Sequence, residues 1–220
     1  MESDSASSIQ REQAYRSLRR LLVLQQLPAG QRLREPEWAA RLNVHRTALR
    51  EAFARLEAEG LIDRGQQTGY FVPVLTDGDL IEITKLRLAL ETLAVDEICD
   101  RDETDSSLTQ RLGPLSIACD ELEQFMRGGY SLGVVEADRR FHEALIDAAG
   151  SRRLSMLYSR APLPLLHRHL EDPDVWQEIC SGTLGEHRQI IAALSRRDAA
   201  EARSLLREHV TKRSLVPTCR

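Results

Sequence analysis

The sequence predicts a mainly α-helical protein that contains one small β-hairpin and divides into two domains near residue 76. Apolar residues recur at helical spacing in nine segments between residues 9 and 214. The exception is residues 61–72, where two short strand-like runs flank the glycine-containing loop 65–69. This pattern predicts a β-hairpin, which Pro73 ends.

The N-terminal domain is expected to span residues 9–75. Three helices are predicted in it, over residues 9–27, 35–42 and 46–59. Pro28-Ala29-Gly30 ends the first helix, Asn43-Val44 makes the turn between the other two, and Gly60 ends the third. Two helices joined by a tight turn and followed by a hairpin indicate a winged helix-turn-helix. The polar residues 1–8 are expected to form a flexible tail.

The C-terminal domain is expected to be an all-α antiparallel bundle over residues 79–214, followed by a flexible tail at 215–220. Six helices are predicted, over residues 79–100, 104–127, 131–149, 151–170, 174–196 and 198–214. Pro162 and Pro164 are expected to kink or interrupt the fourth of them.

Composition indicates a globular protein of the cytoplasm. The chain is 42% hydrophobic and 29% charged, and it holds no continuous apolar run long enough for a membrane span. Its four cysteines lie far apart, which fits a reducing compartment better than a disulfide framework or a thiolate site. Residues 1–75 carry a net charge of +2 and residues 76–220 one of −6. A basic head on an acidic body suits a DNA-binding module joined to another domain.

The third predicted helix has the character of a DNA-recognition helix. Leu49, Phe53 and Leu56 form its apolar stripe, and the polar residues of its first turns lie on the other side. Arginine reads guanine bidentately, and wing residues reach phosphates. The residues expected to contact DNA are His45, Arg46, Thr47, Arg50, Thr68 and Gly69. An arginine taken alone fits a solvated helix face equally well; the order of all the elements favours DNA.

Four metal-competent side chains fall on inward-facing stripes of three predicted helices: Asp138, His142, His187 and His209. A buried carboxylate is costly unless it is paired or bound to metal, so these residues are candidates for a Zn²⁺, Ni²⁺ or Mn²⁺ site. The alternative is three hydrogen-bonded core histidines and a structural aspartate. Spacing places Asp138 beside His142 but does not bring His187 or His209 to them.

Arg87 lies on an apolar helix face, four residues before Glu91. A guanidinium in such a place is suited to bind the carboxylate of a small effector. The alternative is a simple ion pair between Arg87 and Glu91, one helical turn apart.

Residues 9–75 resemble the GntR family of winged-helix regulators. The matching pieces include Pro28-Ala29-Gly30-x-Arg32-Leu33, Glu35-Pro36-Glu37-x-Ala39, Leu49-Arg50-Glu51-Ala52 and Gly69-Tyr70-Phe71-Val72. The chain departs from the family at His45, where serine is usual, at Ala48, where proline is usual, and at Trp38, where leucine is usual. Histidine is a poorer helix N-cap than serine, so His45 is expected to meet DNA differently.

Residues 79–214 resemble the FCD ligand-binding domain of FadR-type GntR regulators. The matching motifs are Asp138-Arg139-Arg140-Phe141-His142-x-x-Leu145, Glu186-His187-x-x-Ile190 and Arg207-x-His209-Val210. The resemblance implies that Asp138 and the three histidines bind a divalent metal at the centre of the domain. It also matches Arg87 and Glu91 to the family's Arg-x-x-x-Glu pattern.

These features together predict a homodimeric transcriptional regulator, expected to be a repressor, that binds a near-palindromic operator and responds to a small carboxylic acid held at the metal. In a second hypothesis the metal itself is the signal. A third is a metal-dependent hydrolase that uses the same four residues. The sequence carries no His-Glu-x-x-His motif and no clearly placed second carboxylate, so the chain is not expected to be an enzyme.

Overall fold

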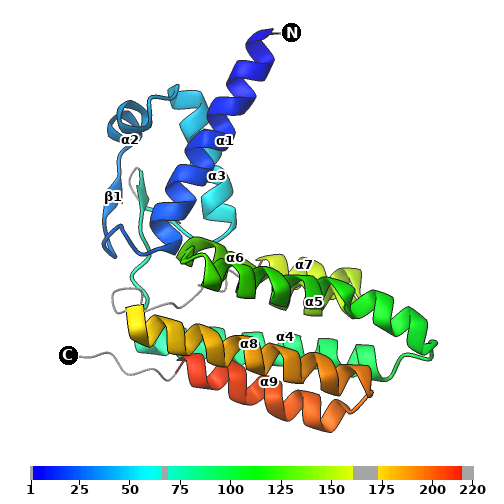
Figure 1. Ribbon diagram of the computed structural model, residues 1–220. Coiled ribbons are helices and arrows are strands. Elements are labelled where there is room, and N and C mark those ends of the chain that lie inside the picture. Colours follow the sequence, from blue (N-terminus) through cyan, green and yellow to red (C-terminus); the bar gives the residue numbers. More distant parts are fainter. Residues whose placement is uncertain (1, 66–68, 161–172, 215–220) are drawn as a thin grey trace. The chain divides into compact units, whose positions relative to one another are not determined.

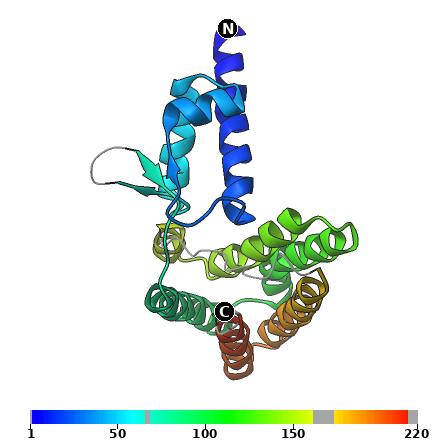
Figure 2. The same ribbon diagram turned by 90° about the vertical axis from the view of Figure 1, so that its left-hand side faces the viewer.

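A computed structural model of the chain describes residues 2–65, 69–160 and 173–214. The chain divides into two compact units. The first holds the described residues up to Thr76 together with Ser159 and Arg160, and the second holds Asp77–Tyr158 and the described residues from 173 onward. Both units are built mainly from helices, and the first also carries a small sheet (Figures 1 and 2). Within the described part of the chain, no helix combines the length and apolar character that crossing a membrane requires.

The first unit is a three-helix domain with a small antiparallel sheet. Its elements are α1 (Glu2–Val23), β1 (Arg32–Leu33), α2 (Glu35–Leu42), α3 (Arg46–Ala58), β2 (Asp63–Arg64) and β3 (Tyr70–Phe71). The sheet has the order β1-β3-β2, and Phe71 lies opposite both Arg32 and Asp63. α1 packs along α3, and the core between the helices includes the fully buried Leu18, Leu49 and Phe53. This confirms the predicted winged helix-turn-helix order.

Three features of the first unit differ from the prediction. α1 ends at Val23 rather than at residue 27, and Gln25, with a φ of +52°, turns the chain before Pro28 is reached. α1 begins at Glu2, so residues 2–8 are helical rather than a tail; they contain neither glycine nor proline, and nothing in the backbone stops the helix from extending. β1 was not predicted, because a two-residue strand is too short to show alternation. The N–H of Gly30 and the C=O of Gln31 also bond Val72, which extends the pairing of β1 with the hairpin.

The second unit is an antiparallel helical bundle. Its helices are α4 (Asp77–Cys99), α5 (Asp105–Arg127), α6 (Ser131–Ala148), α7 (Arg152–Arg160), α8 (Pro173–Ser195) and α9 (Ala199–Ser214). α5 packs mainly against α6, while α9 packs against both α4 and α8, so α4, α6, α8 and α9 enclose a common core (Figure 1). Each helix starts within two residues of its predicted position. The second half of the predicted helix 151–170, with Pro162 and Pro164, lies outside the described residues.

Hydrogen bonds from three arginines connect the helix ends and loops at one end of the bundle. The guanidinium of Arg111 donates to Glu103 at 2.9 Å, and Ser107 donates to the same carboxylate at 2.7 Å. Arg101 donates to the carbonyl of Ala149 just after α6, and Arg197 donates to the carbonyls of Arg101 and Glu103. Arginine side chains therefore satisfy the carbonyl of Ala149 at the end of α6 and two carbonyls of the loop between α4 and α5.

Candidate metal centre and nucleic-acid interface

The four predicted metal ligands meet in the core of the second unit. Asp138 and His142 come from α6, His187 from α8 and His209 from α9. All four are at most 3% exposed, and one ligand atom from each lies within 4.8 Å of the others. The structure thus supplies the contact that helical spacing alone could not: the two distant histidines do reach the Asp138–His142 pair.

The distances between these atoms suit a single ion. Nε2 of His209 lies 3.1 Å from Nε2 of His142 and 3.2 Å from Nε2 of His187, and Nε2 of His187 lies 3.5 Å from Oδ1 of Asp138. Neighbouring ligands bound at about 2.0–2.1 Å are separated by about 2.8–3.0 Å at octahedral angles and by about 3.3–3.4 Å at tetrahedral angles. The donor set therefore fits a divalent metal, and the mixture of imidazoles with one carboxylate oxygen suits zinc or a similar ion.

Two outer carboxylates orient the histidine rings. Oε2 of Glu91 lies 2.9 Å from Nδ1 of His142, and Oε2 of Glu186 lies 2.8 Å from Nδ1 of His209. An ionised carboxylate only accepts, so each Nδ1 carries the proton and donates. The lone pair of each imidazole is then on Nε2, the atom that faces the other ligands, which is the tautomer that metal binding requires.

Both outer carboxylates are held in the ionised form. Burial raises the pKa of Glu91, but the charge of Arg87 and the hydrogen bonds from His142 and Arg87 outweigh it and hold the pKa below its usual range. The hydrogen bond from His209 lowers the pKa of Glu186 to about 2, with Lys212 acting in the same direction against partial burial.

Arg87 forms an ion pair with Glu91, which is the alternative that the sequence offered to effector binding. Its Nε donates to Oε1 of Glu91 at 2.6 Å, and the hydroxyl of Tyr158 on α7 donates to the same oxygen at 2.9 Å. The Arg87 side chain is 14% exposed, and among the described residues its two Nη groups have no recorded hydrogen-bond partner. Glu91 therefore engages one edge of the guanidinium, and no described residue is hydrogen-bonded to the other.

Glu91 and Tyr158 are site residues that sequence reasoning missed. Glu91 was identified only as the ion-pair partner of Arg87, although a glutamate on the buried face of an apolar helix is itself a signal of a second role. Tyr158 lies in a short helix with no motif around it, and no pattern in the sequence pointed to it.

The predicted DNA-contacting residues of α3 share its exposed side. His45, Arg46, Thr47 and Arg50 are exposed, while Ala48 and Leu49 are buried. His45 occupies the N-cap position without a capping side-chain bond, and its N–H donates to Oε1 of Gln10 on α1 instead. Gln10 thus satisfies the backbone N–H of His45 itself, whereas the first-turn N–H groups of α3 that a serine side chain would cap receive no bond from His45.

The two arginines of this face differ in their partners. Nε of Arg50 donates to Oε2 of Glu35, the first residue of α2, at 2.7 Å. Arg46 has no side-chain partner among the described residues. In the wing, Gly69 has a φ of +102°, and a Cβ built on it would lie 3.4 Å from Nε of Arg32, so this position favours glycine. Thr68 lies outside the described residues.

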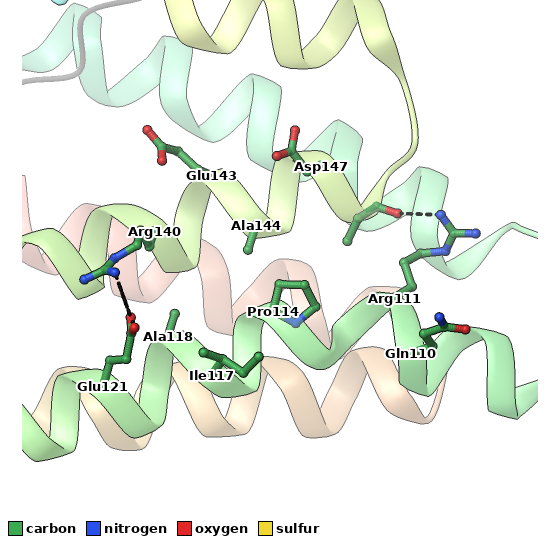
Figure 3. Close-up of a pocket in the computed structure, with 11 residues that line it drawn as sticks. Gln110, Arg111, Pro114, Ile117, Ala118, Glu121, Arg140, Glu143, Ala144 and Asp147 are labelled. Atoms are coloured by element: carbon green, nitrogen blue, oxygen red, sulfur yellow. Dashed lines mark hydrogen bonds and ion pairs between the residues drawn. The ribbon is translucent and has the colours of Figure 1, made fainter. Parts of the chain in front are cut away.

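A separate surface pocket of about 480 Å³ lies between α5 and α6. Its floor is apolar, formed in part by Pro114, Ile117 and Ala144, and the ion pair between Arg140 and Glu121 stands at one side (Figure 3). The residues that line it include none of the four metal-site residues. The pocket is therefore distinct from the candidate metal centre.

Residues 82–212 match the FCD domain family, and residues 10–72 match the family described as bacterial regulatory proteins, gntR family. The chain belongs to the GntR family and carries an FCD domain. Both matches fall on the units seen in the fold, the first on the bundle and the second on the winged domain. The two resemblances found in the sequence are thereby confirmed.

Several curated relatives bear the names of transcriptional regulators. An uncharacterized HTH-type transcriptional regulator of Bacillus subtilis, YdhC, is 29% identical over 66% of this chain and 63% of its own length. The Nta operon transcriptional regulator of Aminobacter aminovorans is 36% identical over 57% of each chain. The Uxu operon transcriptional regulator of Escherichia coli is 28% identical over 94% of this chain and 86% of its own. The chain thus spans about six-tenths of the first two relatives.

Solved structures share the fold. A GntR regulator from Rhodococcus sp. RHA1 covers 93% of this chain and 95% of its own with a TM-score of 0.71 at 24% identity. The McbR/YncC protein of E. coli covers 92% and 94% with a TM-score of 0.69 at 22% identity.

Proposed function

We propose that this GntR-family protein is a DNA-binding transcriptional repressor whose operator affinity is controlled by a small carboxylic acid bound at a divalent metal. The observation that carries the proposal is the convergence of Asp138 with three histidine Nε2 atoms in the core, in a chain whose other unit is a winged helix-turn-helix. Two relatives are named as repressors, the E. coli GlaR and a probable repressor of a D-xylose utilization operon, which supports repression.

In this proposal Asp138, His142, His187 and His209 hold the metal, and the bound ion supplies a Lewis-acidic position for an effector oxygen. Glu91 and Glu186 keep the histidine lone pairs directed at that position. The free Nη edge of Arg87 binds another carboxylate oxygen of the effector, while its Nε stays on Glu91.

On the DNA side, a homodimer places two copies of α3 in successive major grooves of a near-palindromic operator. Arg46 and Arg50 read bases, and His45, Thr47, Thr68 and Gly69 contact bases or phosphates. The effector changes operator affinity only if it binds one arrangement of the two DNA-binding units better than the other.

The test begins with mass spectrometry of small molecules that purify with the full-length chain. Duplexes selected by the protein from a random library then serve as the operator in gel-shift titrations with each molecule found. We expect an organic acid that weakens operator binding, and only in protein that holds metal. Strengthened binding would contradict repression by the acid. Release of DNA on adding metal alone, with no effect of any acid, would favour the metal as the signal.

A further inference from the structure

We infer that Glu35 is a positioning residue for DNA reading: it holds the guanidinium of Arg50 so that the free edge faces a guanine. This inference rests on the proposed recognition face of α3. The contact that carries it is the 2.7 Å hydrogen bond from Nε of Arg50 to Oε2 of Glu35. It joins the two helices of the helix-turn-helix, since Glu35 begins α2 and Arg50 lies in the second turn of α3.

The geometry leaves the reading edge of Arg50 available. A guanidinium offers one edge made of Nε and one Nη, and another made of the two Nη groups. Glu35 engages Nε, and Arg50 has no other recorded partner among the described residues. A bidentate contact with O6 and N7 of guanine needs two N–H groups, which the free Nη pair provides. Glu35 therefore fixes the plane of the guanidinium without occupying its guanine-reading edge.

Glu35 is itself anchored. Its side chain is 26% exposed, whereas that of Arg50 is 66% exposed. Its carboxylate lies in the first turn of α2, where the helix dipole favours negative charge. The carboxylate is thus the more buried partner of the pair, and the proposed base reader is the more exposed one.

The effect expected from this arrangement is on specificity. An arginine that is already ordered loses less conformational entropy when it binds a base than one that is free. A carboxylate near the phosphates also repels DNA of every sequence, so its presence costs affinity without regard to sequence. On removal of the carboxylate, loss of positioning therefore predicts a fall in the ratio of specific to non-specific affinity, whereas loss of repulsion raises both affinities and leaves the ratio unchanged.

Glu35→Gln separates the two effects, and Glu37→Gln is the matched control. Glu37 lies on the same helix, is 63% exposed and pairs with Arg34 rather than with Arg50. Both substitutions remove one negative charge from the same unit. Binding is measured by fluorescence anisotropy at one fixed salt concentration. The probes are a duplex selected by the wild-type full-length chain from a random library, versions with each guanine replaced in turn, and an unrelated duplex.

We expect both variants to bind the unrelated duplex slightly more tightly, and only Glu35→Gln to lose specificity, by about three- to tenfold in the affinity ratio. The loss should be confined to one guanine position and should disappear when Arg50→Ala is already present. An unchanged ratio in Glu35→Gln, alongside a loss in Arg50→Ala, would overturn the inference and leave the recognition face standing. A gain of specificity in Glu35→Gln would also overturn it, because Glu35 would then compete with guanine for the Arg50 guanidinium. No effect of Arg50→Ala, or no enriched sequence, would overturn both.

Discussion

Glu91 accepts a hydrogen bond from Nδ1 of His142 at 2.9 Å, and both side chains are almost completely buried. Through its other oxygen the same carboxylate contacts Arg87 and Tyr158. One residue of α4 therefore connects a candidate metal ligand to the candidate effector-binding arginine. Loss of the metal and replacement of Arg87 are therefore both expected to change the hydrogen bonding of the Glu91 carboxylate.

Glu91→Gln should weaken metal binding by about 10- to 100-fold, because an outer carboxylate raises the basicity of the imidazole it orients. The measurement is a titration of metal-stripped protein with Zn²⁺ against a competing chelator. Glu97→Gln, an exposed change on the same helix, is the control. Glu186→Gln should also weaken metal binding, because Glu186 orients His209. Since Glu186 is less buried than Glu91, this second variant tests the same role if Glu91→Gln fails to fold. Unchanged affinity in both outer-carboxylate variants would rule out this role.

Arg87→Gln should abolish the response to the organic acid but leave the metal in place. The substitution removes the charged donors that face the effector, whereas Arg87 is not among the four metal ligands. The readout is the acid-dependent rise in melting temperature of metal-loaded protein, with metal content measured on the same sample. Arg127→Gln, an exposed change on α5, is the control. Retention of the full shift in Arg87→Gln would show that the effector is bound elsewhere.

Arg50→Ala and Arg46→Ala should each reduce specific DNA binding by about 1–3 kcal/mol, with little effect on binding to unrelated sequences beyond the loss of one charge. Gel shifts with a selected duplex and an unrelated one measure both quantities. Arg16→Ala removes an exposed arginine that pairs with Glu12 on its own helix α1, and it serves as the control. If Arg16→Ala has the same effect as the α3 variants, the α3 arginines contribute only sequence-independent attraction to DNA and do not read bases.

Glu103 is expected to make stability depend on pH. Hydrogen bonds from Arg111 and then Ser107 lower its pKa to about 2 against an ordinary value of 4.5. Because the folded-state pKa is lowered, the contribution is complete above pH 4.5 and is lost as the pH falls toward 2. Glu103→Gln should be less stable than wild type to urea at pH 7, and the gap should narrow below pH 4.5. Asp105→Asn, at a 99% exposed side chain, should show no such pattern. A gap that stays constant with pH would contradict the assignment.

Most of the fold could be predicted, because the regular spacing of apolar residues identifies a long helix from the sequence alone. The stripe of Leu49, Phe53 and Leu56 is buried as the spacing predicts. The errors lie where the local signal is weak: β1 has two residues, and the start of α1 depends on residues without an apolar pattern.

The candidate metal centre could be predicted only in part. Periodicity showed that His187 and His209 point inward, but not that their Nε2 atoms lie 3.2 Å apart, because that distance depends on how α8 packs against α9. The resemblance to the FCD domain supplied the grouping. Tyr158 could not be found at all, since its partner Glu91 lies 67 positions away in the chain.

The most direct test of the metal-centred account is the metal content of the full-length chain. Wild-type protein and His187→Ala are each incubated with Zn²⁺, Ni²⁺ or Mn²⁺, dialysed and measured by elemental analysis, with His45→Ala in the other unit as the control. The account predicts about one ion per chain in wild type and in His45→Ala, and loss of the ion in His187→Ala. A metal-free wild type, or stoichiometric metal retained in His187→Ala, would contradict it.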